Sequence, residues 1–151
     1  MLVATGRYNN ADPLLKISLG ADPSPLQEFE AVIDTGCTGF LSIPAHIAQR
    51  LGIVPDHTEQ ITYADGVTRP CQSAIGFASV GGKIYEGDVA IEEFSIDILL
   101  GIDFLRRFKL ALFMTSTLIL LMDENEVEKM MARNIPSPPS PDLPISSVPP
   151  S

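Results

Sequence analysis

The stretch AVIDTGCTGFLSIP, residues 31–44, places Asp34, Thr35 and Gly36 directly after three apolar residues. An ionised carboxylate in an apolar setting is costly unless it is paired or takes part in chemistry. Two such carboxylates held close together cannot both ionise easily, and a pair that shares one proton can activate a water molecule. The alternative is that Asp34 only caps its own turn. The elements around the motif favour catalysis.

A strand is predicted before the motif and a second strand, residues 40–43, after it, with Gly36 and Gly39 allowing a tight turn between them. A second apolar element, Leu99-Leu100-Gly101, leads into a short predicted helix. Asp103 falls in the first turn of that helix, where the helix dipole favours a carboxylate, although a role as a second catalytic acid is the alternative.

The hairpin signal Asp65-Gly66 lies between these two elements, inside a segment of β-forming residues at 59–70. Further strands are predicted by apolar spacing and by the turn residues that separate them, at 12–20, 26–33, 71–80, 83–94 and, as two strands or one bent strand, 110–122. A short helix is expected between Pro44 and Gly52. The pattern predicts an all-β chain that forms a small barrel or sandwich with one or two short helices.

The composition excludes several classes of function. A net charge of −9 and a pI of about 4.5 argue against nucleic acid as a partner. Residues 110–122 are about half as long as a membrane helix, and the N-terminus lacks a signal pattern. A cytoplasmic protein with Cys37 and Cys71 as free thiols is therefore expected. His46 and His57 have no recognisable nucleophile partner and are expected to be solvated.

The C-terminal part differs in composition. Residues 123–134 form an acidic segment, either a short helix or a frayed end. Seven of the 13 prolines lie in residues 135–151, so this tail is expected to be disordered or to adopt polyproline II structure. Its PxxP spacings could bind an SH3-like partner, although such tails are more often plain linkers.

These motifs together resemble the retropepsin-like aspartic proteases, especially the short single-domain bacterial members. The resemblance spans about residues 12–122, within a protease domain of residues 1–122. The residues that carry it are Ala31 to Gly36, Gly39-Phe40-Leu41 with Pro44, Ala64-Asp65-Gly66, and Leu99 to Leu105.

The resemblance implies a small closed all-β barrel and, since the chain has one Asp-Thr-Gly, a homodimer with Asp34 of each chain at its two-fold axis. Water held between the two carboxylates would hydrolyse a peptide bond, without a metal or a cofactor. Thr35 would hydrogen-bond to the partner chain, and Gly36 would let its amide approach the carboxylate. Ala64, Asp65, Gly66 and Val67 would form a flap over an extended peptide, and Leu99, Leu100, Gly101 and Asp103 would support the site.

Two departures from the family keep alternatives open. Thr38 stands where viral members have an acidic residue that binds substrate, so a non-catalytic dimeric module that binds peptides or acts as a scaffold is the alternative function. Cys37 follows the motif, where it is either a small apolar filler or a thiol whose oxidation would block the site.

Overall fold

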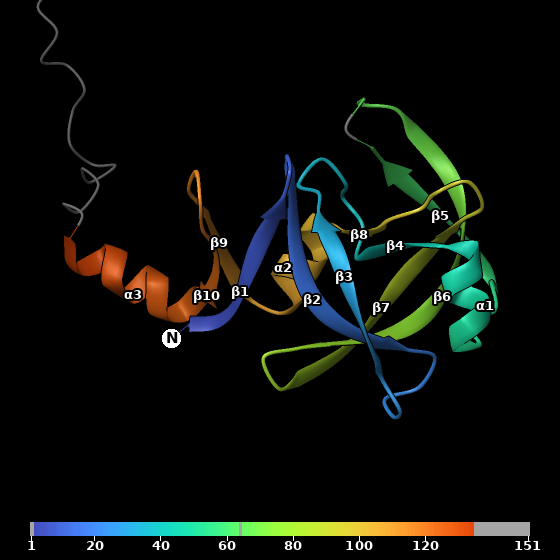
Figure 1. The fold of residues 1–151 in the computed structure, drawn as a ribbon, viewed down its shortest axis with the longest axis horizontal. Helices are drawn as coiled ribbons and strands as arrows, with labels where there is room; N and C mark the ends of the chain where they lie inside the picture. Colours follow the sequence, from blue (N-terminus) through green and yellow to red (C-terminus); the bar gives the residue numbers. More distant parts are fainter. Residues whose placement is uncertain (1, 64, 135–151) are drawn as a thin grey trace, which may run out of the picture.

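The computed structural model describes residues 2–63 and 65–134, so the expected flap residue Ala64 and the proline-rich segment 135–151 lie outside the described residues. The described part is built mostly of strands, with three short helices (Figure 1). The strands are β1 (Leu2–Asn9), β2 (Asp12–Gly20), β3 (Gln27–Ile33), β4 (Leu41–Pro44), β5 (His57–Thr62), β6 (Thr68–Val80), β7 (Lys83–Glu92), β8 (Ile98–Leu100), β9 (Leu110–Met114) and β10 (Ile119–Asp123). The helices are α1 (Ala45–Leu51), α2 (Ile102–Arg107) and α3 (Glu124–Asn134).

Six of the strands close into a barrel. They follow the order β6-β7-β4-β8-β3-β2, and the ring closes where Ser18–Gly20 of β2 pair with Phe77–Ser79 of β6. The closed barrel confirms the fold class expected from the sequence. Strand β5 extends the sheet beyond β6, and β1, β10 and β9 extend it beyond β2.

Strand β8 lies between β3 and β4 and fixes the position of the segment that joins them. It runs parallel to β3, with Ile33 opposite Leu100, and antiparallel to β4, with Leu41 opposite Leu100. The connection at residues 34–40 therefore loops around the end of β8. This loop carries the Asp-Thr-Gly motif.

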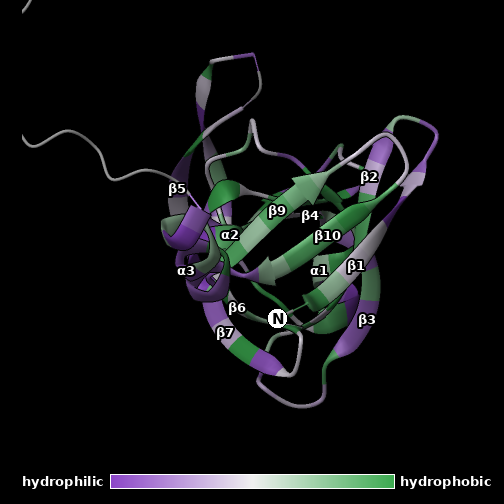
Figure 2. Ribbon diagram, turned by 90° about the vertical axis from the view of Figure 1, so that its left-hand side faces the viewer, coloured by the Kyte–Doolittle hydropathy of each residue, from purple (hydrophilic) through white to green (hydrophobic). Residues whose placement is uncertain are grey.

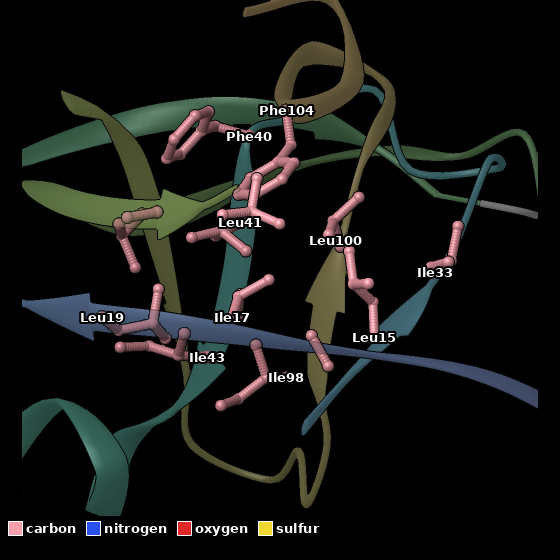
Figure 3. Close-up of a cluster of buried hydrophobic side chains, with 14 of the residues drawn as sticks. Leu15, Ile17, Leu19, Ile33, Phe40, Leu41, Ile43, Ile98, Leu100 and Phe104 are labelled. Carbon is pink, nitrogen blue, oxygen red and sulfur yellow. The ribbon is translucent and has the colours of Figure 1, made fainter. Parts of the chain in front are cut away.

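The barrel encloses a core of alternating strand residues (Figure 3). Leu15, Ile17 and Leu19 share one face of β2 and are at most 2% exposed, because successive side chains of a strand point to opposite faces. Phe40 packs on Phe104 of α2 with ring centroids 5.2 Å apart. Burial of each such side chain contributes about 1.5–3 kcal/mol, so the core holds the loop before β4 against the helix after β8.

The predicted hairpins are present. Strands β2 and β3 pair around the loop at 21–26, and β6 and β7 are joined by Gly81 and Gly82, which both have positive φ. Residues 110–122 form the hairpin of β9 and β10, and the helix after Pro44 ends at Gly52 with φ of 74°.

The acidic segment adopts the helical alternative: it is the helix α3, which buries Val127, and with it the described residues hold three helices. Strand β1 has no predicted counterpart, since its mixed sequence becomes a strand only by pairing with β10 and β2. In Figure 2, β1, β10 and β9 lie side by side as a largely apolar sheet, with α3 beside them. Among the described residues, none of the helices combines the length and the apolar character that spanning a membrane requires.

Candidate active site

Asp34 is held by backbone groups at the point where β3 ends. Its amide donates to the carbonyl of Leu100 at 2.9 Å, and its own carbonyl accepts from the amide of Cys37 at 3.1 Å. The amide of Gly36 donates to Asp34 Oδ1 at 3.0 Å. The carboxylate is half-buried, whereas Thr35 and Gly36 are exposed. The loop thus orients a carboxylate at the surface of the chain.

The expected support residues lie against this loop and contact it through the backbone. The amide of Gly101 donates to Phe40 O at 3.1 Å, that of Ile102 to Cys37 O at 2.9 Å, and that of Asp103 to Gly39 O at 3.2 Å. A Cβ atom on Gly101 would lie 2.1 Å from the carbonyl oxygen of Gly39. A glycine is therefore required here by close approach, because the φ of Gly101, −95°, is accessible to any residue.

The carboxylate of Asp103 stands in the first turn of α2, 3.6 Å from Arg107. This is the position in which the helix dipole favours a negative charge. The geometry therefore agrees with the structural alternative for Asp103 rather than with a second catalytic acid.

Cys37 is part of the loop at residues 34–40, and it is only 1% exposed. It packs with Ile61 of β5 and Ala90 of β7, and burial raises the pKa of its thiol. A thiol in such surroundings reacts slowly, because the thiolate is the reactive form. These features favour the apolar-filler alternative for Cys37.

Thr38 joins the loop to the β5–β6 hairpin. Its amide donates to Thr62 O at 3.3 Å, and its hydroxyl accepts from the amide of Thr62 at 3.4 Å. The backbone and the hydroxyl of Thr38 therefore connect this loop to the hairpin. No local sequence pattern predicts this role.

The tip of the β5–β6 hairpin is a tight turn in which Gly66 has φ of 78°. The amide of Val67 donates to Asp65 Oδ1 at 2.9 Å, and Arg69 forms an ion pair with the same carboxylate. Both contacts lower the pKa of Asp65. Asp65 is therefore a turn residue, as Asn and Asp commonly are, and the exposed side chain of Val67 stands beside it.

A cluster that the sequence analysis missed lies at the base of the same hairpin. His46 is exposed on α1 as expected, but the expectation of a solvated His57 is wrong. His57 is in β5, half-buried, with Asp56, Glu59 and Asp88 around its ring. The sequence signal was the close spacing of the acidic residues Asp56 and Glu59 around His57.

Comparisons with known proteins agree with this geometry. The model of the family described as "gag-polyprotein putative aspartyl protease" matches residues 26–107, which include Asp34, the β5–β6 hairpin and Gly101. Among curated proteins, none matches significantly.

Two solved structures are similar. A retropepsin-like aspartic protease from Rickettsia conorii shares 20% identity with a TM-score of 0.54, over 80% of this chain and 88% of that one. The foamy viral protease-reverse transcriptase, solved with an RNA/DNA hybrid, shares 17% identity with a TM-score of 0.42, over 80% of this chain and 15% of that one. The first match shows the retropepsin-like fold. Since the family model covers more than half of the chain, the chain belongs to this family of aspartyl proteases and has a retropepsin-like fold.

Proposed function

We propose that two copies of this chain form an aspartic endopeptidase whose catalytic groups are the two Asp34 carboxylates. The observation that carries the proposal is the placement of Asp34. Its carboxylate is oriented at the surface by the Gly36 amide and by β8, in a chain of the aspartyl protease family that contains one Asp-Thr-Gly. A dyad then requires a second copy.

The mechanism follows from two carboxylates that share one proton. The ionised carboxylate accepts a proton from a water molecule held between them, and the water oxygen attacks the carbonyl carbon of the scissile peptide bond. The protonated carboxyl group gives its proton to the carbonyl oxygen. The tetrahedral intermediate then expels the amine, which takes the proton that the first carboxylate accepted from water, while a hydroxyl proton of the intermediate returns to the second carboxylate. No acyl-enzyme forms. The chemistry needs no metal or cofactor.

Thr35 and Gly36 have complementary roles in this proposal. Gly36 donates its amide to Asp34 within one chain. The Thr35 hydroxyl has no hydrogen-bond partner among the described residues of one chain and is exposed. In the dimer it would donate across the two-fold axis to the loop of the partner, which would hold the two loops coplanar.

Strand β9 offers a surface through which two copies can associate. It lies at one end of the strand order, so one of its edges has no strand beside it among the described residues. Phe113 and Met114 on this strand are 41% and 46% exposed, and Leu118 in the adjoining turn is 54% exposed. An apolar edge strand readily pairs with another strand, and a two-fold axis would pair β9 with its own copy.

The β5–β6 hairpin would act as the flap. An extended peptide would lie between its tip, at Asp65, Gly66 and Val67, and the Asp34 loops, adding its backbone to the neighbouring strands. Closure of the hairpin would exclude water from the dyad. The Thr38–Thr62 contacts would connect the end of β5 that lies next to the turn to the loop at residues 34–40.

The test is cleavage of a diverse peptide mixture between pH 4 and 7.5, read by mass spectrometry. Wild type is compared with Asp34→Asn, which keeps the shape and removes the acid, and with Asp22→Asn, a matched change in the exposed β2–β3 loop. We expect the same cuts from wild type and Asp22→Asn and none from Asp34→Asn. Equal cutting by Asp34→Asn would refute the proposal, and a dimer that cuts nothing would favour the non-catalytic peptide-binding module.

A further inference from the structure

Three side chains of metal-binding type converge at the base of the β5–β6 hairpin. His57 and Glu59 lie two residues apart on one face of β5, and Asp88 comes from β7. His57 Nε2 lies 2.8 Å from Asp88 Oδ1 and 3.3 Å from Glu59 Oε1. One ligand atom of each residue lies within 4.8 Å of the other two, and all three residues are half-buried.

The hydrogen-bonding pattern of the imidazole requires a cation in this cluster. Nδ1 of His57 faces the carboxylate of Asp56, an acceptor, so the ring donates its Nδ1–H there. Nε2 then presents a lone pair toward the carboxylates of Glu59 and Asp88, which are also acceptors. Three acceptors that face one another need either a proton on Nε2 or a metal ion between them.

The charge of the cluster favours the metal ion over the proton. The ion pairs that Asp56, Glu59 and Asp88 form among the described residues all go to His57. Three carboxylates around a single imidazolium leave a formal charge of −2. A divalent ion in place of the proton, with a neutral imidazole, lowers this formal charge to −1 and therefore compensates the carboxylates better than the proton does.

We propose that His57 Nε2, Glu59 and Asp88 bind a zinc ion and that Asp56 orients the ring of His57. An imidazole ligand selects zinc over magnesium or calcium, which prefer oxygen ligands only. Ligand atoms around tetrahedral zinc lie about 3.3 Å apart, since each is roughly 2.0–2.2 Å from the ion. The observed 2.8 and 3.3 Å separations need only a small adjustment. A carboxylate on the second nitrogen is the usual support of a metal-bound histidine.

A cavity of about 190 Å³ lies beside two of the three ligands. Glu59 and Asp88 line it together with Thr38 and Gly39 from the loop at residues 34–40. Water from this cavity can complete the coordination, so the site is of the open kind with three protein ligands. The ion would join β5 to β7 across β6 and hold the base of the hairpin. The site does not depend on whether the chain cleaves peptides.

The test is isothermal titration calorimetry of the full chain with zinc chloride at pH 7.5 in a buffer that does not bind zinc. We expect one zinc ion per chain, at least about 10-fold weaker binding for His57→Gln and for Asp88→Asn, and unchanged binding for His46→Gln. His46 is the chain's second histidine and lies exposed on α1, so it is a matched control. Magnesium chloride in excess should not compete.

The role of Asp56 has its own readout. Asp56→Asn should weaken zinc binding by about 10- to 100-fold. In the wild type, zinc should shift the Nε2 resonance of His57 in long-range ¹H–¹⁵N spectra while Nδ1 stays protonated. If His57→Gln fails to fold, these spectra and the zinc affinity of Asp88→Asn test the proposed zinc site in its place. Absence of zinc binding, binding that survives His57→Gln and Asp88→Asn, or equal loss in His46→Gln would overturn the proposal.

Discussion

Gly101 has no side chain, and this absence lets the loop at residues 34–40 approach the end of β8 closely. A methyl group there would meet the carbonyl oxygen of Gly39 at 2.1 Å, and backbone cannot move aside as a flexible side chain can. Gly101→Ala should therefore lower the free energy of unfolding by about 3 kcal/mol or more. Urea denaturation followed by circular dichroism measures this change.

Gly52→Ala is the control for that substitution. Gly52 has φ of 74° but nothing within 4 Å of an added Cβ, so it tests backbone strain without a clash. The expected cost is about 1 kcal/mol. A loss for Gly101→Ala no larger than that for Gly52→Ala would show that the close approach to Gly39 does not constrain the loop.

The thiol of Cys37 provides a second test at the scale of one residue. Burial raises the pKa of this thiol, so little thiolate forms at pH 8. In a Cys71→Ser background, iodoacetamide should label Cys37 at pH 8 far more slowly in the folded chain than in 6 M guanidinium chloride. Similar rates in the two states, measured by mass spectrometry, would contradict the apolar-filler interpretation.

The sequence predicted the turn after β3 and the glycine after β8, because Gly36 and Gly101 meet local backbone requirements that their residue type reveals, whereas the catalytic role of Asp34 stays a prediction. It did not predict the contacts of Thr38, whose partner Thr62 lies on β5, nor the contact of His57 with Asp88, which lies on β7 with β6 between the two strands. Contacts between distant segments leave no local pattern. Such contacts are therefore visible only in the folded structure.

At the scale of elements, the hairpin of β5 and β6 is held at its tip by one carboxylate. The Val67 amide and Arg69 lower the pKa of Asp65, so its contribution to the turn is present above the unfolded value near 3.9. The contribution is lost as the pH falls through the lower folded value. The tip should therefore stay ordered throughout the mildly acidic range in which a shared-proton dyad works.

Hydrogen exchange of the amides at residues 65–69 measures this order between pH 3 and 6. Protection at Val67 should fall only at the acid end of this range in the wild type. Asp65→Asn keeps an acceptor for the Val67 amide but cannot titrate, so its protection should not change with pH beyond the intrinsic exchange rate. A loss of wild-type protection already at pH 5 to 6 would contradict the assignment to Asp65.

The elements themselves were largely predictable, and the exceptions have a common cause. Glycine pairs and apolar alternation located the β6–β7 hairpin, the β2–β3 hairpin and the helix that ends at Gly52. Strand β1 escaped prediction because its pairing with β10 supplies the order that its own sequence does not. The closure of β2 onto β6 likewise joins segments that no turn connects.

At the scale of the whole molecule, the proposed activity requires two chains, and β9 is the edge through which they would meet. Met114→Lys places a charge on this strand, and a two-fold axis brings it near its own copy. We expect the dissociation constant of the dimer to rise at least about 10-fold because like charges oppose each other and lysine blunts an edge strand. Sedimentation velocity at several concentrations measures it.

Met131→Lys is the matched control, since Met131 is 51% exposed on α3. It should leave the dimer unchanged. Removal of residues 110–122 should give a monomer or an aggregate. A dimer that keeps its affinity with Met114→Lys would place the interface away from β9.

The crossing of β8 between β3 and β4 also sets the order of events during synthesis. The amide of Asp34 finds its partner, the carbonyl of Leu100, only after the chain has been made through β8, because the barrel strands β4, β6 and β7 lie between them in the sequence. Closing so long a loop is slow compared with forming the local hairpins. A nascent chain on the ribosome therefore carries an unformed Asp-Thr-Gly loop, and the proposed dyad could assemble only after the barrel of each chain is complete.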